Sequence, residues 1–116
     1  MQDYKRLTIW RLAHALNLKA HRLVRRFPSG YAGLIAQIRR SAESVPSNIV
    51  EGRYRRTDAD FAKFLTQSLS SLMELEYHLL FARDEGLIAG SVFDGFEADI
   101  EVLRRTLIAF IKRLRP

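Results

Sequence analysis

Residues Arg39–Gly52 read RRSAESVPSNIVEG, and this stretch decides the fold. Its apolar residues continue a series with the three- and four-residue spacing of one helix face: Tyr31, Ile35, Ile38, Ala42, Val45 and Ile49. Pro46 lies inside that face. Proline lacks the N–H that would bond the carbonyl of Ala42, and its ring crowds this carbonyl, at a cost of about 3 kcal/mol. We therefore expect a helix at about 31–53 that is kinked or interrupted near Pro46.

A polar stripe runs beside the apolar one at the same helical spacing. It contains Ser41, Ser44, Asn48 and Glu51. Residues 58–84 carry a matching stripe: Gln67, Ser71, Glu74 and His78. Polar groups between packed helices need hydrogen-bond partners. We expect a polar network between these two stripes, either within one chain or between subunits.

Three further segments show the helical repeat of apolar residues. The sequence predicts these helices at about 7–27, 58–84 and 91–114. Pro28-Ser29-Gly30 ends the first, Thr57 is the predicted N-cap of the next, and Ser91-x-x-Asp94 resembles a capping box for the last. Four amphipathic helices with short turns bury their apolar faces most economically in an antiparallel arrangement. The predicted fold is an all-α, up-down-up-down four-helix bundle.

Composition limits the class of protein. The 116 residues fit a single domain, 1–116, and 47% are hydrophobic against 28% charged, which is typical of a folded globular chain. The absence of cysteine excludes disulfides, thiolate metal ligands and cysteine nucleophiles. No apolar run approaches the roughly 20 residues that a membrane-spanning helix needs, and the N-terminus has no apolar signal core. We expect a cytoplasmic protein.

Charge is distributed unevenly along the chain. The net charge is +6, but residues 1–56 contain twelve Lys and Arg against three Asp and Glu, whereas residues 57–116 contain seven against ten. The outer face of the first predicted helix carries Arg11, Lys19, Arg22, Arg25 and Arg26. The second predicted helix is followed by Arg53, Tyr54, Arg55 and Arg56. Guanidinium groups bind phosphate and tyrosine can stack on an unpaired base, so both groups are candidate nucleic-acid contacts. A solvated charged surface is the alternative interpretation.

The segment 58–84 has more apolar surface than one bundle core requires. Tyr77 and Phe81 are among the residues that widen its apolar arc beyond the roughly 100° that faces a core. Apolar surface left outside the core is typical of a contact with another protein. We expect Tyr77 and Phe81 to lie at an interface between subunits.

No residue pattern predicts catalysis. A di-iron site in a helical bundle needs Glu-x-x-His on two helices, and this sequence has no such motif. Glu74 and His78 are four residues apart and are interpreted as a hydrogen-bonded pair. Glu51 is interpreted as an ion-pair partner of a nearby arginine, not as a general base. A Gly-x-Ser-x-Gly elbow and a glycine-rich phosphate loop are both missing. We expect a non-enzymatic protein that has no cofactor and no metal.

The stretch 39–52 resembles the signature of a known family. The residues that carry the signature are Arg39, Arg40, Pro46, Asn48, Glu51 and Gly52. Leu7, Trp10, Phe27-Pro28 and residues 71–76 fit the same pattern, so the similarity extends over nearly the whole chain. The sequence thus resembles the 23S rRNA intervening-sequence protein family of small bacterial four-helix-bundle proteins. This resemblance implies a homo-oligomer, specifically a ring of five subunits.

Two functions fit these observations. In the first, basic patches repeated around the oligomer bind nucleic acid, with RNA favoured over DNA only because of the family's name. In the second, the basic and acidic halves of neighbouring subunits attract each other, and the oligomer is a scaffold that recruits another protein, such as a reverse transcriptase. Replacing Arg55 and Arg56 separates the two hypotheses, because only the scaffold requires these arginines for assembly.

Overall fold

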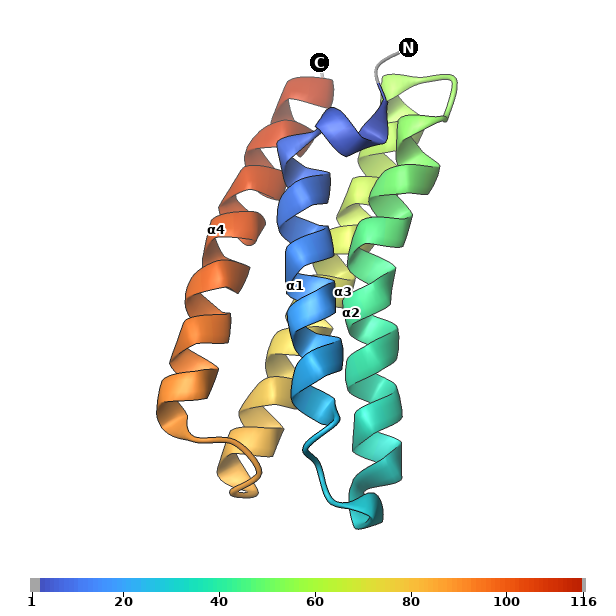
Figure 1. Cartoon of the computed structure of the whole chain (residues 1–116). Coiled ribbons are helices and arrows are strands. Elements are labelled where there is room, and N and C mark those ends of the chain that lie inside the picture. The colour runs from blue at the N-terminus through green and yellow to red at the C-terminus, as the bar shows by residue number, and fades with distance from the viewer. Residues whose placement is uncertain (1–2, 116) are drawn as a thin grey trace.

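The computed structural model describes residues 3–115 and shows four long helices packed side by side (Figure 1). The helices are α1 (Thr8–Val24), α2 (Ala32–Arg53), α3 (Asp58–Asp84) and α4 (Gly90–Leu114), with the short 3-10 helices η1 (Tyr4–Arg6) and η2 (Ser29–Tyr31) before α1 and α2. Each α-helix packs against the next one in sequence, and α1 also contacts α4. The predicted antiparallel four-helix bundle is confirmed.

The bundle is elongated and has two distinct ends. Its dimensions are 45 × 21 × 20 Å. One end, here called the α2–α3 end, holds the turn between α2 and α3, together with η1 and the C-terminus of α4 (Figure 1). The opposite end, here called the α1–α2 end, holds the α1–α2 and α3–α4 turns. This arrangement decides which charged residues lie together.

Local capping signals predict the helix starts only in part. Thr57 caps α3 as expected, because its side chain accepts a hydrogen bond of 3.1 Å from the backbone N–H of Asp60. The capping box predicted at Ser91-x-x-Asp94 is wrong. α4 begins at Gly90, and the preceding Ala89 contributes no side-chain cap. The start of α4 is therefore set by packing of its apolar face and not by a polar cap.

Pro46 does not interrupt α2. The helix is continuous from Ala32 to Arg53, so the predicted interruption is wrong, while a kink within the helix stays a prediction. Val45 and Ile49, on either side of the proline, are completely buried. The packing of these residues holds the helix together despite the missing hydrogen bond, because most helix stability in proteins comes from tertiary packing.

The core is apolar except at the contact between α2 and α3. Ser68 of α3 is fully buried, and its hydroxyl donates a 2.8 Å hydrogen bond to the carbonyl of Val45 in α2. The hydroxyl of Ser71 donates to that of Ser44 at 3.0 Å, and the Asn48 side chain donates to the same Ser44 oxygen at 3.1 Å. The predicted polar network between the two helices is therefore confirmed at Ser44, Asn48 and Ser71. Ser68 is not among the predicted residues.

Gly52 is the glycine with the least space around it, and it lies where α2 packs against α3. A Cβ atom at Gly52 would lie 2.7 Å from Cβ of Phe64 and 2.9 Å from Cδ1 of Phe61. These separations are below van der Waals contact, so only glycine fits without a shift of the helices. The signature glycine thus has a packing role.

No helix within residues 3–115 combines the length and the apolar character needed to cross a membrane.

Candidate nucleic-acid interface

The predicted nucleic-acid contacts lie at both ends of the bundle. Arg11, near the start of α1, lies toward the α2–α3 end, and Tyr54, in the α2–α3 turn, contacts η1 there. Arg22, Arg25 and Arg26 lie at the α1–α2 end of α1 (Figure 1). At 1.5 Å per residue, the distance along α1 from Arg11 to Arg25 is about 21 Å. The nine predicted residues therefore do not form one patch.

Lys19 differs from the other predicted contacts because it is already paired within the chain. Its ammonium nitrogen lies 2.9 Å from Oδ2 of Asp99 in α4 and 4.3 Å from the centroid of the Phe96 ring. Lys19 and Asp99 both line a pocket of about 200 Å³ between α1 and α4, together with Leu12 and Val102. Lys19 joins two helices, so we leave it out of the proposed binding surface.

The arginines of the N-terminal half have no carboxylate partner within the part of the chain that the structure describes. Within residues 3–115, ion pairs shorter than 4.0 Å involve none of the following: Arg11, Arg22, Arg25, Arg26, Arg39, Arg40, Arg53, Arg55 and Arg56. The predicted pairing of Glu51 with a nearby arginine is also absent from these ion pairs. Arginines that are not neutralised by the protein itself remain available to an external anion such as phosphate.

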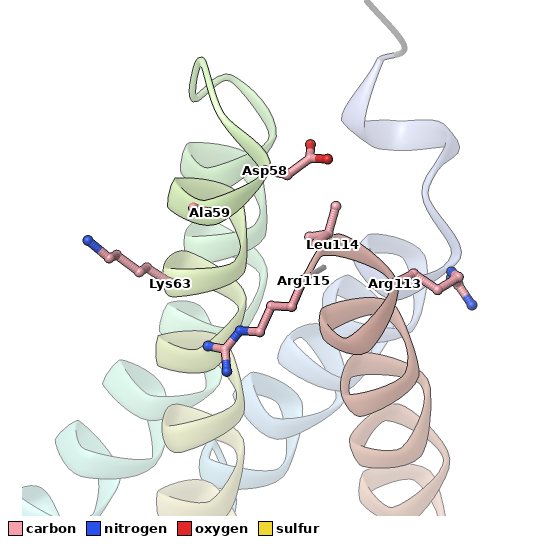
Figure 2. Close-up of a pocket in the computed structure, with 6 residues that line it drawn as sticks. All are labelled: Asp58, Ala59, Lys63, Arg113, Leu114 and Arg115. Carbon is pink, nitrogen blue, oxygen red and sulfur yellow. The ribbon is translucent and has the colours of Figure 1, made fainter.

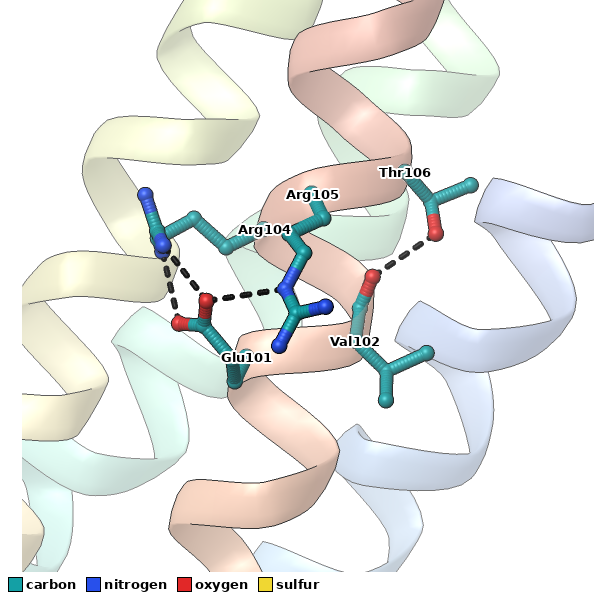
Figure 3. A network of polar contacts seen from close by, with 5 residues as sticks. All are labelled: Glu101, Val102, Arg104, Arg105 and Thr106. Atoms are coloured by element: carbon teal, nitrogen blue, oxygen red, sulfur yellow. Dashed lines mark hydrogen bonds and ion pairs between the residues drawn. The ribbon is translucent and has the colours of Figure 1, made fainter.

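Arg104 and Arg105 in α4 share one carboxylate of their own helix. Figure 3 shows Glu101 between Arg104 and Arg105, which donate hydrogen bonds of 2.9 and 3.0 Å to its carboxylate. These hydrogen bonds lower the pKa of Glu101 to about 2. In the same helix the hydroxyl of Thr106 donates to the carbonyl of Val102 at 2.7 Å. This cluster leaves little free charge for a ligand.

The C-terminus of α4 adds cations to the α2–α3 end. Figure 2 shows a surface pocket of about 610 Å³ between the start of α3 and the end of α4, which is lined by Asp58, Lys63, Arg113 and Arg115. Arg115 extends across the pocket toward α3, whereas Arg113 points outward. These residues belong to the half of the sequence that is acidic overall, and only the fold places them at the same end of the bundle as Arg53–Arg56.

Positive charge is concentrated at the α2–α3 end. Ten cationic residues lie there: Lys5, Arg6, Arg11, Arg53, Arg55, Arg56, Lys63, Lys112, Arg113 and Arg115. Four acidic residues accompany them: Asp3, Glu51, Asp58 and Asp60. Within the same distance of the helix ends, about five residues, the α1–α2 end has a smaller excess of cations: Lys19, Arg22, Arg25, Arg26 and Arg83 against Asp84, Glu85 and Asp94. A polyanion is therefore attracted mainly to the α2–α3 end.

Four aromatic rings form a row at the α2–α3 end. The Tyr54 and Tyr4 rings lie edge to face with centroids 6.3 Å apart, and Tyr4 meets Trp10 in the same way at 5.1 Å. The ring of His14 stacks on Trp10 at 4.7 Å. Tyr4, Trp10 and His14 are not among the predicted contacts, because the pattern of α1 places Trp10 in the core. Tyr4 and Tyr54 are 50 residues apart, so no local signal connects them.

The α3 residues predicted at a subunit interface are exposed. Tyr77 is 60% exposed and Phe81 is 41% exposed. Nearby Glu76 has a pKa that is raised mainly by burial and further by the negative charge of Glu97 in α4.

The side chains of Glu74 and His78 are 3.6 Å apart, which is too far for the predicted hydrogen bond. No group of three or more His, Asp or Glu side chains in residues 3–115 is arranged to hold a metal ion.

Comparison with known proteins identifies similar sequences and folds. Residues 5–109 match a family model described as 23S rRNA-intervening sequence protein. The fold is similar to a crystal structure from Bacteroides thetaiotaomicron, described as a protein with unknown function from the S23 ribosomal protein family. The TM-score is 0.83, the sequence identity is 21%, and the alignment covers 90% of this chain and 99% of that chain. At this identity the likeness supports the fold alone. No curated protein matches the chain.

Proposed function

Because this chain belongs to the 23S rRNA-intervening sequence protein family, we propose that it is a cytoplasmic, non-enzymatic homo-oligomer, specifically a pentamer, that binds nucleic acid through the α2–α3 end. RNA is favoured over DNA by the name of the family. The observation that carries the proposal is the set of arginines without carboxylate partners, together with the excess of cations at one end of the bundle.

Assembly strengthens such a surface. A single patch of arginines binds phosphate weakly, because each contact competes with water and salt. A ring presents several copies of the same patch, and contacts by linked copies raise the overall affinity without any new interaction. The exposed Tyr77 and Phe81 supply apolar surface for this assembly, since they lie on α3 and not in the core.

The test compares two double variants that remove equal charge from opposite ends. Arg55→Ala with Arg56→Ala removes two unpaired guanidinium groups from the more cationic end, whereas Arg25→Ala with Arg26→Ala removes two from the opposite end. Binding of a structured RNA is measured against salt concentration. Each lost phosphate contact reduces the slope of log K against log salt by about 0.7–0.9. We expect a reduction of about 1.4–1.8 per subunit for the first variant and little change for the control.

Two results refute the proposal. Absence of binding at about 50 mM salt rejects it directly, because phosphate-driven affinity is strongest at low salt. Equal effects of the two double variants reject the assignment to the α2–α3 end.

The second candidate function is an interaction scaffold that does not bind nucleic acid. The observation that favours it is the exposure of Tyr77 and Phe81 beside the acidic pair Glu76 and Glu97, a surface suited to a basic protein face. In that case the Arg55 and Arg56 variant loses its oligomeric state in light scattering, because arginines of one subunit pair with carboxylates of the next. Loss of RNA binding by an intact oligomer supports the first function.

A further inference from the structure

We propose that the α2–α3 end binds unpaired nucleotides, with Tyr54 as the ring on which a base stacks. This inference rests on the proposed function, since the surrounding arginines bind the phosphates of the same strand. It adds the ligand class: a single-stranded segment and not a duplex.

Tyr54 is held in place before any ligand arrives. Its ring contacts Tyr4, which in turn contacts Trp10. η1, which carries Tyr4, is fixed at its start by the Asp3 side chain, which accepts a 3.1 Å hydrogen bond from the backbone N–H of Lys5. The same segment is tied to α1 by Arg11, whose Nε donates to the carbonyl of Lys5 at 2.9 Å. A ring fixed in this way loses little conformational entropy when a base stacks on it.

Tyr54 remains accessible although it is anchored. The residue is 52% exposed, which leaves much of its aromatic surface free for a ligand. Its neighbours in sequence are arginines without carboxylate partners. The guanidinium carbon of Arg55 lies 4.6 Å from the centroid of the Phe64 ring, and this cation–π contact holds one positive charge beside the turn. The Nε atom of Arg53 is buried and has no hydrogen-bond partner within the described chain.

The combination of a ring and cations favours an unpaired strand over a duplex. Arginines alone attract the backbone of any nucleic acid. An exposed aromatic ring contributes additional affinity only when a base can leave its own stack and present a face. Bases inside a duplex already stack on their neighbours, so they gain nothing from Tyr54 without the cost of unpairing.

The experiment uses the full chain and four probes: a 12-nucleotide oligo(U) RNA, the DNA oligonucleotide of the same length, a 12-base-pair RNA duplex, and inorganic polyphosphate. Binding to wild type is compared with Tyr54→Leu, which keeps bulk and removes the aromatic face, and with Tyr54→Phe, which keeps the face. Stacking on one aromatic residue changes affinity about 5- to 140-fold. We expect Tyr54→Leu to bind oligo(U) weaker by this factor and Tyr54→Phe to bind like wild type.

Trp10 provides a second readout because it is the only tryptophan in the sequence. Through Tyr4 it belongs to the same aromatic row as Tyr54. We expect oligo(U) to change its fluorescence, whereas polyphosphate, which has charge but no bases, leaves the fluorescence nearly unchanged. This difference separates base contact from phosphate contact in one titration.

Each outcome supports or overturns the inference. The inference is supported if Tyr54→Leu alone loses affinity for oligo(U) while its binding of the duplex and of polyphosphate is unchanged. If RNA and DNA then bind equally, only the preference for RNA is removed. Equal oligo(U) binding by Tyr54→Leu and wild type overturns the inference that a base stacks on Tyr54. Phosphate binding, and with it the proposed function, is then unaffected. Failure of all four probes to bind rejects both. Dissociation of the Tyr54→Leu oligomer overturns it in favour of a protein contact at this surface.

Discussion

Replacement of Gly52 by alanine tests the closest approach between α2 and α3. The added Cβ atom would lie 2.7 Å from Cβ of Phe64 and 2.9 Å from Cδ1 of Phe61. The Phe61 ring can rotate, but Cβ of Phe64 is fixed by the backbone of α3. The two helices must therefore separate locally, which disturbs the buried residues around the contact.

Two opposing terms determine the magnitude. Alanine favours a helix interior over glycine by about 1 kcal/mol. Overpacking of a close helix contact costs about 1–3 kcal/mol. We expect Gly52→Ala to lower the free energy of unfolding by about 1–2 kcal/mol, because the fixed position of Phe64 Cβ places the cost in the upper part of that range.

Gly95→Ala is the matched control. Gly95 also lies within a helix, α4, but a Cβ there would approach nothing closer than the flexible end of Lys19, at 3.8 Å. This variant gains the helix propensity without a clash, so we expect an increase of about 0.5–1 kcal/mol. Thermal unfolding at one fixed protein concentration measures both variants, and 1 kcal/mol corresponds to about 4 °C for a chain of this length. Equal stabilisation by the two alanines would refute the close contact at Gly52.

Three further predictions concern stability and assembly. Ser68→Ala removes the buried hydrogen bond to α2 and should cost about 1 kcal/mol in denaturant unfolding; an unchanged midpoint would contradict this role. The raised pKa of Glu76 means that its charged form is unfavourable in the folded state, so its contribution to stability is present at low pH and lost as the pH rises through the folded pKa. Glu76→Gln should therefore stabilise the protein at pH 7 and give no advantage near pH 4, as measured by thermal unfolding; a gain that persists at pH 4 would show that the charge of Glu76 is not its cause. Tyr77→Ser with Phe81→Ser should lower the molar mass in light scattering, and a dilute wild-type protein that is already monomeric would disprove the assembly.

The sequence predicts most of the fold because the evidence for helices is local. Apolar spacing places the four helices at nearly their observed positions, and short turns leave an antiparallel bundle as the economical arrangement. The exceptions also have local causes. Ser91 and Asp94 have the right spacing for a capping box, but α4 begins at Gly90, two residues earlier than that motif requires. Pro46 predicts a break, but α2 is continuous because Val45 and Ile49, on either side of the proline, are packed in the core.

The candidate surface is only partly predictable from the sequence. Arg53–Arg56 stand out because they follow one another after a helix. Lys19 looks equally available in the sequence, yet it pairs with Asp99, 80 residues away, in the folded chain. The arginines at the C-terminus of α4 belong to the acidic half of the sequence, but the fold brings them to the cationic end.

The sequence by itself therefore determined the number, order and approximate limits of the helices, the family signature and the surplus of arginines. Tertiary structure alone decided which of those arginines lack partners, that positive charge gathers at one end, and that Tyr4, Trp10 and Tyr54 meet there. The physical reason is that helical periodicity repeats within a few residues and is visible along the chain. Contacts between distant residues depend on the rotation and axial position of each helix, which are fixed only when all four apolar faces pack together.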